Sequence, residues 1–297
     1  MTEIRHKIGL AGSLVLNNVS GSVNVRATDV DEVIVVARSA SGRGEPEIDI
    51  ERGPDSLRVE PRCQRGRSFL GGSLFANPQN IDFEVSLPRS ARLSLKCVSA
   101  DVRAEGLAGE QSYKTVSGDL ILASTGGQIS LTTVSGDARV QANLPLELEA
   151  NTTSGDLWIS AERLGLVQIR TVSGDVELHG GFTPNVRHTV ESVSGDLVVE
   201  PVGGLTVETR RALDIGRGKG QDLVTGDGAA SLRFRSMSGD VRLAGGRPGA
   251  RRAPASRVAS PPPTAGDTDA LEVLRALERG EIDVDEATRR LEETKRG

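Results

Sequence analysis

The stretch Thr115-Val116-Ser117-Gly118-Asp119-Leu120 returns through the middle of the sequence with small changes. Val-Ser-Gly-Asp occurs again at 134–137, 172–175 and 193–196, with near-copies at 153–156 and 237–240. Successive motif aspartates (119, 137, 156, 175, 196, 240) are 18, 19, 19, 21 and then 44 residues apart. A fixed period near 20 residues is typical of a solenoid, a propeller or another repeat array. The last interval is interpreted as two long repeats with one motif lost.

Alternating apolar residues flank each copy of this motif. They occupy every second position after the aspartate, as in Leu120 and Leu122, and every second position before the motif, as in Ile129 and Leu131. A period of two indicates half-buried strands. Glycine reaches positive φ without steric cost, and Ser and Asp side chains bond to their own nearby backbone, so Ser-Gly-Asp predicts a tight corner between two strands.

Stacked copies of this unit predict a mainly β protein, a β-solenoid with turns of about 18 to 22 residues. Equivalent residues of successive turns then become neighbours about 4.8 Å apart. We expect the motif valines Val116, Val134 and Val172 to share one interior column. Small residues before the motif should form a ladder that bonds from turn to turn. The ladder comprises Cys97, Thr115, Thr133, Thr152, Thr171, Ser192 and Ser236.

Changes in composition divide the chain into segments. Residues 1–80 alternate without the strict motif and are predicted to form an N-terminal β cap and early turns, with Val19-Ser20-Gly21-Ser22 as a degenerate corner. Residues 81–244 hold the solenoid repeats, in which residues 210–230 are interpreted as an insertion that lengthens the last interval. Residues 245–268 form a disordered linker rich in Pro, Gly and Arg.

The last segment, residues 269–297, predicts a small α-helical hairpin. Two capping-box patterns, Asp269 with Glu272 and Asp283 with Glu286, open its two helices. Helices this short are marginal alone, so we expect their apolar faces to bind a protein partner or a second copy of the chain.

One internal stretch, residues 61–80, is longer than a corner requires. It combines Arg62, Arg65 and Arg67 with Phe69 and Phe75. It is either a contact loop for a partner or an anionic surface, or an ordinary insertion whose phenylalanines pack on the cap.

Charge and composition exclude several classes of protein. The net charge is −5 over 297 residues, so the sequence does not favour a nucleic-acid partner. The start lacks the apolar run of a signal peptide, and no stretch approaches the ~18 apolar residues of a membrane span, so we expect a cytoplasmic protein without a transmembrane segment. The basic linker allows peripheral membrane contact as a weaker alternative. Cys63 and Cys97 lack metal-site spacing and are interpreted as reduced thiols.

The motif aspartates are the only constellation that suggests chemistry. Stacking would align them along one edge, where they either complete the corners or bridge Ca²⁺, which takes 6–8 oxygen ligands. These aspartates are Asp119, Asp137, Asp156, Asp175 and Asp196. We favour the corner role. The histidines, His6, His179 and His188, are scattered, so no catalytic, cofactor-binding or metal residue is assigned and no enzyme is expected.

The single tryptophan marks one outward column. Two residues after each aspartate this column is Ile121, Arg139, Trp158, Glu177 and Val198, which places Trp158 between Arg139 and Glu177. An outward Trp can anchor a partner, or it can be covered by the neighbouring Arg in a cation–π contact.

The recurrent Thr-Val-Ser-Gly-Asp-Leu/Val with alternating flanks, over about residues 10–245, resembles the bacterial putative-adhesin family of β-strand-repeat proteins, which are domains of unknown function. The tail from Leu274 to Ala287 resembles a SHOCT-like two-helix module. The resemblance implies a right-handed β-solenoid, no known catalytic activity, and proposed roles in envelope-associated interaction or stress signalling.

The sequence therefore predicts a non-enzymatic protein-interaction or scaffold protein, in which a rigid β-solenoid carries a helical tail for oligomerisation or recruitment. A surface adhesin or polysaccharide-binding protein is one alternative. A bactofilin-like polymerising scaffold is the other.

Overall fold

The computed structural model describes residues 1–40, 45–62, 80–211, 222–244 and 247–248. The chain divides into two units, Met1–Ala250 and Arg251–Gly297, and the described residues all belong to the first. The predicted helical hairpin at 269–297 and most of the linker therefore lie outside the described residues. So do Cys63 and the arginines and phenylalanines of the 61–80 stretch beyond Arg62.

Most of the described residues are in β-strands, and none of them is helical. The strands of the N-terminal part are β1 (Thr2–Lys7), β2 (Ser13–Thr28), β3 (Glu32–Ser39), β4 (Ile48–Arg52), β5 (Ser56–Pro61) and β6 (Ile81–Pro88). The middle comprises β7 (Arg92–Glu105), β8 (Gln111–Ser117), β9 (Leu120–Thr133), β10 (Ala138–Ser154), β11 (Leu157–Ser173), β12 (Val176–Phe182), β13 (Arg187–Ser194) and β14 (Leu197–Pro201). The last strands are β15 (Leu205–Arg211), β16 (Asp222–Thr225), β17 (Ala230–Ser238), β18 (Val241–Leu243) and β19 (Arg247–Pro248).

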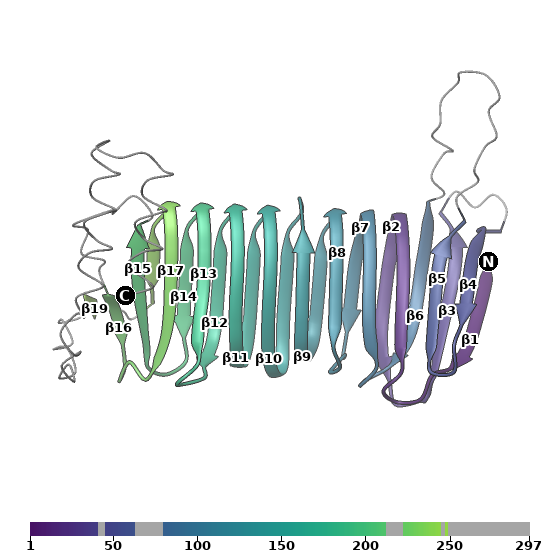
Figure 1. Cartoon of the computed structure of the whole chain (residues 1–297), viewed down its shortest axis with the longest axis horizontal. Helices are drawn as coiled ribbons and strands as arrows, with labels where there is room; N and C mark the ends of the chain where they lie inside the picture. The colour runs from purple at the N-terminus through teal and green to yellow at the C-terminus, as the bar shows by residue number, and fades with distance from the viewer. Residues whose placement is uncertain (41–44, 63–79, 212–221, 245–246, 249–297) are drawn as a thin grey trace, which may run out of the picture. The chain divides into compact units, whose positions relative to one another are not determined.

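From β7 to β14, and again in β17 and β18, the chain winds in coils that stack in parallel, as Figure 1 shows for β7 to β13. Each coil contributes one strand segment to each of two sheet faces. In β9, β10 and β11 a single long strand runs along the second face, bends, and returns along the first face, and the motif corner then leads to the next coil. The predicted stacking of residues about 19 apart is thus confirmed, while its handedness stays a prediction.

The core lies between the two faces. On the second face Leu120, Ala138 and Leu157 are register partners, and on the first face Leu131, Ala150 and Ile169 are. All six are at most 3% exposed. The core also holds aromatic rings, since Tyr113 and Phe83 are fully buried. The Tyr113 hydroxyl is accommodated because it donates to Oε1 of buried Gln111 at 2.9 Å.

The N-terminal end mixes strand directions. Strand β2 pairs in parallel with β7 through Gly21 and Ala100, and Ser22 takes the place of a motif aspartate opposite Asp101. Beyond it, β3 pairs antiparallel with both β1 and β6, and β4 pairs antiparallel with β5. Antiparallel strands at this end close the parallel stack with a different pairing.

The long interval between Asp196 and Asp240 contains no lost coil, so that interpretation is wrong. The backbone N–H of Asp240 donates to Oδ1 of Asp196 at 2.9 Å, so the two corners are direct neighbours. The extra residues instead place β15 on the far side of β17, where it pairs with β16 in an antiparallel hairpin. Within the predicted linker, Arg247 and Pro248 form β19, which pairs with β16.

Candidate functional site

The motif glycines turn the chain at the corner where one face meets the other. Gly155 has a φ of +121°, and a Cβ there would approach the carbonyl oxygen of Gly136 in the preceding coil to less than the 3.0 Å that Cβ atoms respect. Gly118, Gly136, Gly174 and Gly195 share this conformation. Glycine is required because the chain needs both positive φ and close contact between coils.

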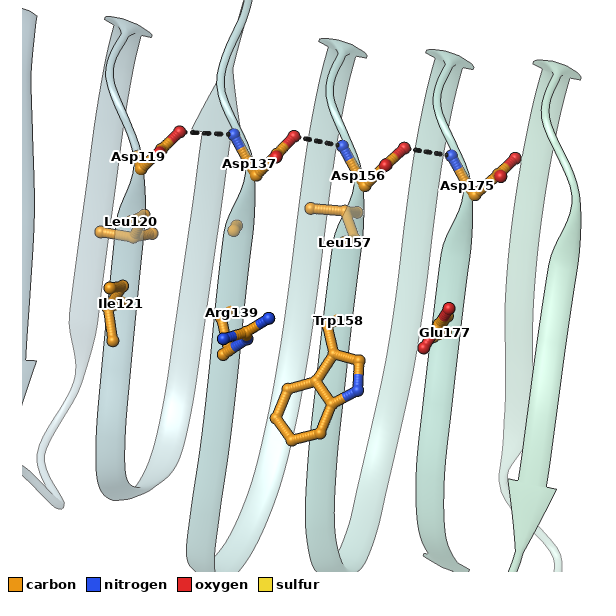
Figure 2. A pocket seen from close by; sticks show the side chains of 11 residues that line it. Asp119, Leu120, Ile121, Asp137, Arg139, Asp156, Leu157, Trp158, Asp175 and Glu177 are labelled. Carbon is orange, nitrogen blue, oxygen red and sulfur yellow. Dashed lines mark hydrogen bonds between the residues drawn. The ribbon is translucent and has the colours of Figure 1, made fainter.

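Each motif aspartate binds the next coil. Oδ1 of Asp137 accepts the backbone N–H of Asp156 at 2.9 Å, and Oδ1 of Asp156 accepts that of Asp175 at 2.8 Å (Figure 2). The backbone carbonyl of Asp156 in turn accepts the N–H of Ala138 at 2.9 Å. The expectation that these side chains bond to their own backbone is therefore wrong. The parallel stack brings the N–H of the next corner within reach, and a carboxylate binds it strongly.

The carboxylates of the aspartate column already have partners in the backbone. One oxygen of each bonded carboxylate is engaged by an N–H group of the next coil. Nowhere in the described ranges do three or more His, Cys, Asp or Glu side chains gather so that they could hold a metal ion. The calcium alternative thus finds no support in this part of the chain.

The hydroxyl ladder occupies the predicted column but bonds differently. Its members are register partners from Cys97 to Ser236, and all are at most 9% exposed. The Thr133 hydroxyl donates to the carbonyl of Ser135, two residues on, at 3.2 Å. Equivalent bonds occur at Thr115, Thr152 and Thr171. The prediction of bonds from turn to turn is wrong, because the corner interrupts the strand ladder and the hydroxyl satisfies a carbonyl of its own corner.

The motif valines lie on the outside, so their predicted interior column is wrong. Val116, Val134 and Val172 are 48%, 47% and 48% exposed. They do stack from coil to coil, since the N–H of Ser135 bonds to the carbonyl of Val116 and the N–H of Ser154 to that of Val134. The strict alternation of the strand explains their direction, because Leu131 and Thr133 point inward and Val134 must then point outward.

An open groove of about 390 Å³ lies on the second face beside the aspartate column. Asp119, Asp137, Asp156 and Asp175 form one side of it, and the outward residues of the next column form the other. This column is the predicted one, since Ile121, Arg139, Trp158, Glu177 and Val198 are successive register partners. Figure 2 shows the Trp158 indole broadside between Arg139 and Glu177, below the row of carboxylates.

Two side chains lie against Trp158. The Arg139 Cζ atom is 5.4 Å from the indole centroid, which confirms the predicted cation–π contact. The His179 ring lies 5.5 Å away at 43°. His179 is itself held by Glu200, with Nδ1 and Oε2 3.0 Å apart, and its Nε2 is 3.6 Å from Glu177. Sequence reasoning missed this histidine. The repeat spacing could have placed it, because His179 pairs with Ser160, which lies two residues after Trp158.

The other described cysteine and histidine side chains are buried or bonded to the backbone of the chain. Cys97 is buried, and burial raises the pKa of its thiol to about 12. His188 is buried against Phe182, and its Nε2 is 3.1 Å from the carbonyl of Thr183. Burial lowers the pKa of His188, because an apolar setting disfavours the charged ring. His6 binds the carbonyl of Gly53 through Nε2 at 2.7 Å.

With this geometry established, the chain can be compared with known proteins. Residues 73–201 match the model of the Toastrack DUF4097 family. A solved structure described as a putative adhesin from Bacteroides fragilis is 9% identical, with 82% of this chain and 96% of that chain covered and a TM-score of 0.49. A putative cell adhesion protein from Clostridium sporogenes is 12% identical, with 82% and 98% covered and a TM-score of 0.25. None of the curated proteins matches the chain. In the part of the chain that the structure describes, no helix could span a membrane.

Proposed function

We propose that this chain is a non-enzymatic, adhesin-type binding protein whose ligand is a polysaccharide, bound in the groove at Trp158. The observation that carries the proposal is the half-buried indole, which lies broadside in a groove lined by carboxylates and one guanidinium. Its volume of about 390 Å³ falls in the range of small-ligand sites, ~300–1,000 Å³.

The chemistry of the groove suits a sugar. A pyranose ring offers an apolar face of C–H groups and a rim of hydroxyls. The apolar face can stack on Trp158, and the hydroxyls can donate to Asp137 and Asp156 or accept from Arg139. The aspartates that line the groove come from four successive coils, and a site that extends over four coils favours a polymer over a single sugar.

A ligand would lose little free energy in reaching the face of the indole that Arg139 covers. Arg139 is exposed, and a cation–π contact at an exposed site stabilises by only ~0.5–1 kcal/mol. A stacked sugar ring therefore needs to displace one exposed side chain, whose guanidinium can then bind a hydroxyl.

The proposal assigns the groove no catalytic step. The aspartates beside Trp158 each bind a backbone N–H of the next coil, so their first role is to hold the coils together. The same aspartates line the groove, so their carboxylates are also acceptors for a bound ligand.

Binding to a panel of immobilised polysaccharides tests the proposal. We expect Trp158→Ala to weaken retention by about tenfold or more, which corresponds to the ~1.4 kcal/mol typical of an aromatic contact, and Trp158→Phe to keep most of it. Arg170→Ala is the matched control, because Arg170 lines a separate groove of about 220 Å³ with residues of the first face. Retention of no polysaccharide by the full chain, or equal retention by Trp158→Ala, would refute the proposal.

A further inference from the structure

A row of exposed side chains, all but one of them apolar, runs along the motif corners. We call it the valine stripe; it comprises Val98, Val116, Val134, Thr153, Val172, Val193 and Met237. Its six apolar members are 43–50% exposed. Seven coils at ~4.8 Å give it a length of roughly 29 Å. Single exposed apolar residues are ordinary, whereas a contiguous row marks an interaction surface.

The fold itself does not require valine at this position. The corner is held by the glycine, the aspartate and the inward threonine, and Thr153 occupies the same position in the 153–156 copy. The outward valines therefore contribute little to the core of their own chain. Six of the seven positions nevertheless carry an apolar side chain that stays about half exposed in the monomer.

Charged lanes of opposite sign flank the stripe. Two residues before it, on the first face, lie outward positions that carry four cations and one anion: Lys96, Lys114, Thr132, Asn151, Arg170, Glu191 and Arg235. Three residues after it lies the aspartate lane, Asp101, Asp119, Asp137, Asp156, Asp175, Asp196 and Asp240. Glu191 pairs with Arg170 and Arg235 at 3.5 and 3.4 Å, so Lys96 and Lys114 carry most of the free positive charge.

The lanes of two copies have complementary charges when the copies pair in one particular orientation. We propose that two copies of this chain pair through their valine stripes, side by side and parallel, about a two-fold axis that runs along the stripe. Such an axis exchanges the two flanks, so the basic lane of each copy faces the aspartate lane of the other. An antiparallel pair would instead bring like lanes together, and repulsion disfavours it.

The size of the interface sets the expected strength. The contact would be roughly 29 Å long and as wide as the stripe and its two lanes. Over both copies it would bury on the order of 1,000 Å² of surface, which is at the low end for specific interfaces. We therefore expect a reversible dimer with a dissociation constant on the order of micromolar, weakened by salt because the lanes are exposed.

Sedimentation velocity of the full chain over a concentration series tests the pairing. We expect Val116→Asp with Val134→Asp to weaken dimerisation by at least about tenfold, because charges would enter an apolar contact. Val30→Asp with Val202→Asp is the matched control, since these valines are 57% and 75% exposed but lie outside the stripe. A monomer at all concentrations, a species larger than a dimer, or an equal loss in the control pair would overturn the proposal.

Cross-linking tests the orientation. In a Cys63→Ser background, a parallel two-fold axis brings residue 134 against its own copy, so Val134→Cys should form an intermolecular disulfide when oxidised. An antiparallel pair would link Val134→Cys to Val172→Cys in a mixture and would overturn the parallel arrangement. If residues 269–297 of the same chain covered the stripe, no intermolecular link would form, and the proposal would fail. Trp158→Ala should leave the dimer unchanged, which separates this result from the proposed function.

Discussion

The substitution Gly155→Ala tests the corner most directly. The φ of +121° is one that residues with a Cβ rarely adopt, which costs ~1–3 kcal/mol. The new Cβ would also meet the Gly136 carbonyl, so the two coils would have to move apart. That movement strains two bonds between the coils, Asp156 N–H to Asp137 Oδ1 and Ala138 N–H to the Asp156 carbonyl, each 2.9 Å and worth about 1 kcal/mol. We expect a total loss of about 3–5 kcal/mol in the free energy of unfolding.

Gly165→Ala is the matched control, placed in β11, the strand that follows the corner of Gly155. Gly165 has no positive φ, and a Cβ there would have its nearest atom, the Leu146 carbonyl oxygen, at 3.3 Å. The change should therefore stay within about 1 kcal/mol. Urea unfolding followed by circular dichroism gives both values, and amide hydrogen exchange shows whether the loss is confined to the coils around residue 155. Equal destabilisation by the two substitutions would refute the role given to the corner glycines.

Three further predictions concern single side chains. Asp156→Ala should destabilise the chain by ~1 kcal/mol in urea, because the Asp175 N–H loses its acceptor, whereas Asp156→Asn should retain most of that stability. Cys97 should resist thiol reagents at about pH 8 in a folded Cys63→Ser chain and react only in urea, because burial holds its pKa near 12; fast reaction of the folded chain would contradict this. Because the folded pKa of His188 lies below its ordinary 6.5, the unfolded chain binds more protons at mildly acidic pH. Its contribution to the free energy of unfolding should therefore be complete above about pH 6.5 and lost as the pH falls toward the folded pKa; an equal acid loss in His188→Gln would contradict the assignment.

The sequence predicted the repeat, the parallel register and the outward tryptophan column, because these depend on spacing alone. It placed Val134 on the wrong side because its hydrophobicity outweighed the alternation, although inward Leu131 and Thr133 already required an outward Val134. The aspartate bonds could not be predicted in the same way. Whether Asp137 binds its own backbone or that of Asp156 depends on the height of one coil above the next, a distance that no local pattern contains.

The two candidate surfaces, the valine stripe with its lanes and the groove at Trp158, depend on the repeat in different ways. Translation from coil to coil repeats whatever the corner requires, so the aspartate lane and the valine stripe extend along the whole stack and suit a partner with the same repeat, such as a second copy of the chain. The groove depends instead on a residue that does not repeat. Tryptophan occurs once in the sequence, and the neighbouring coils carry other residues in its column. A ligand that stacks on Trp158 can therefore be held at only one level of the stack. The repeated corner residues thus form a surface for association along the stack, and the single Trp158 fixes the level at which a ligand binds.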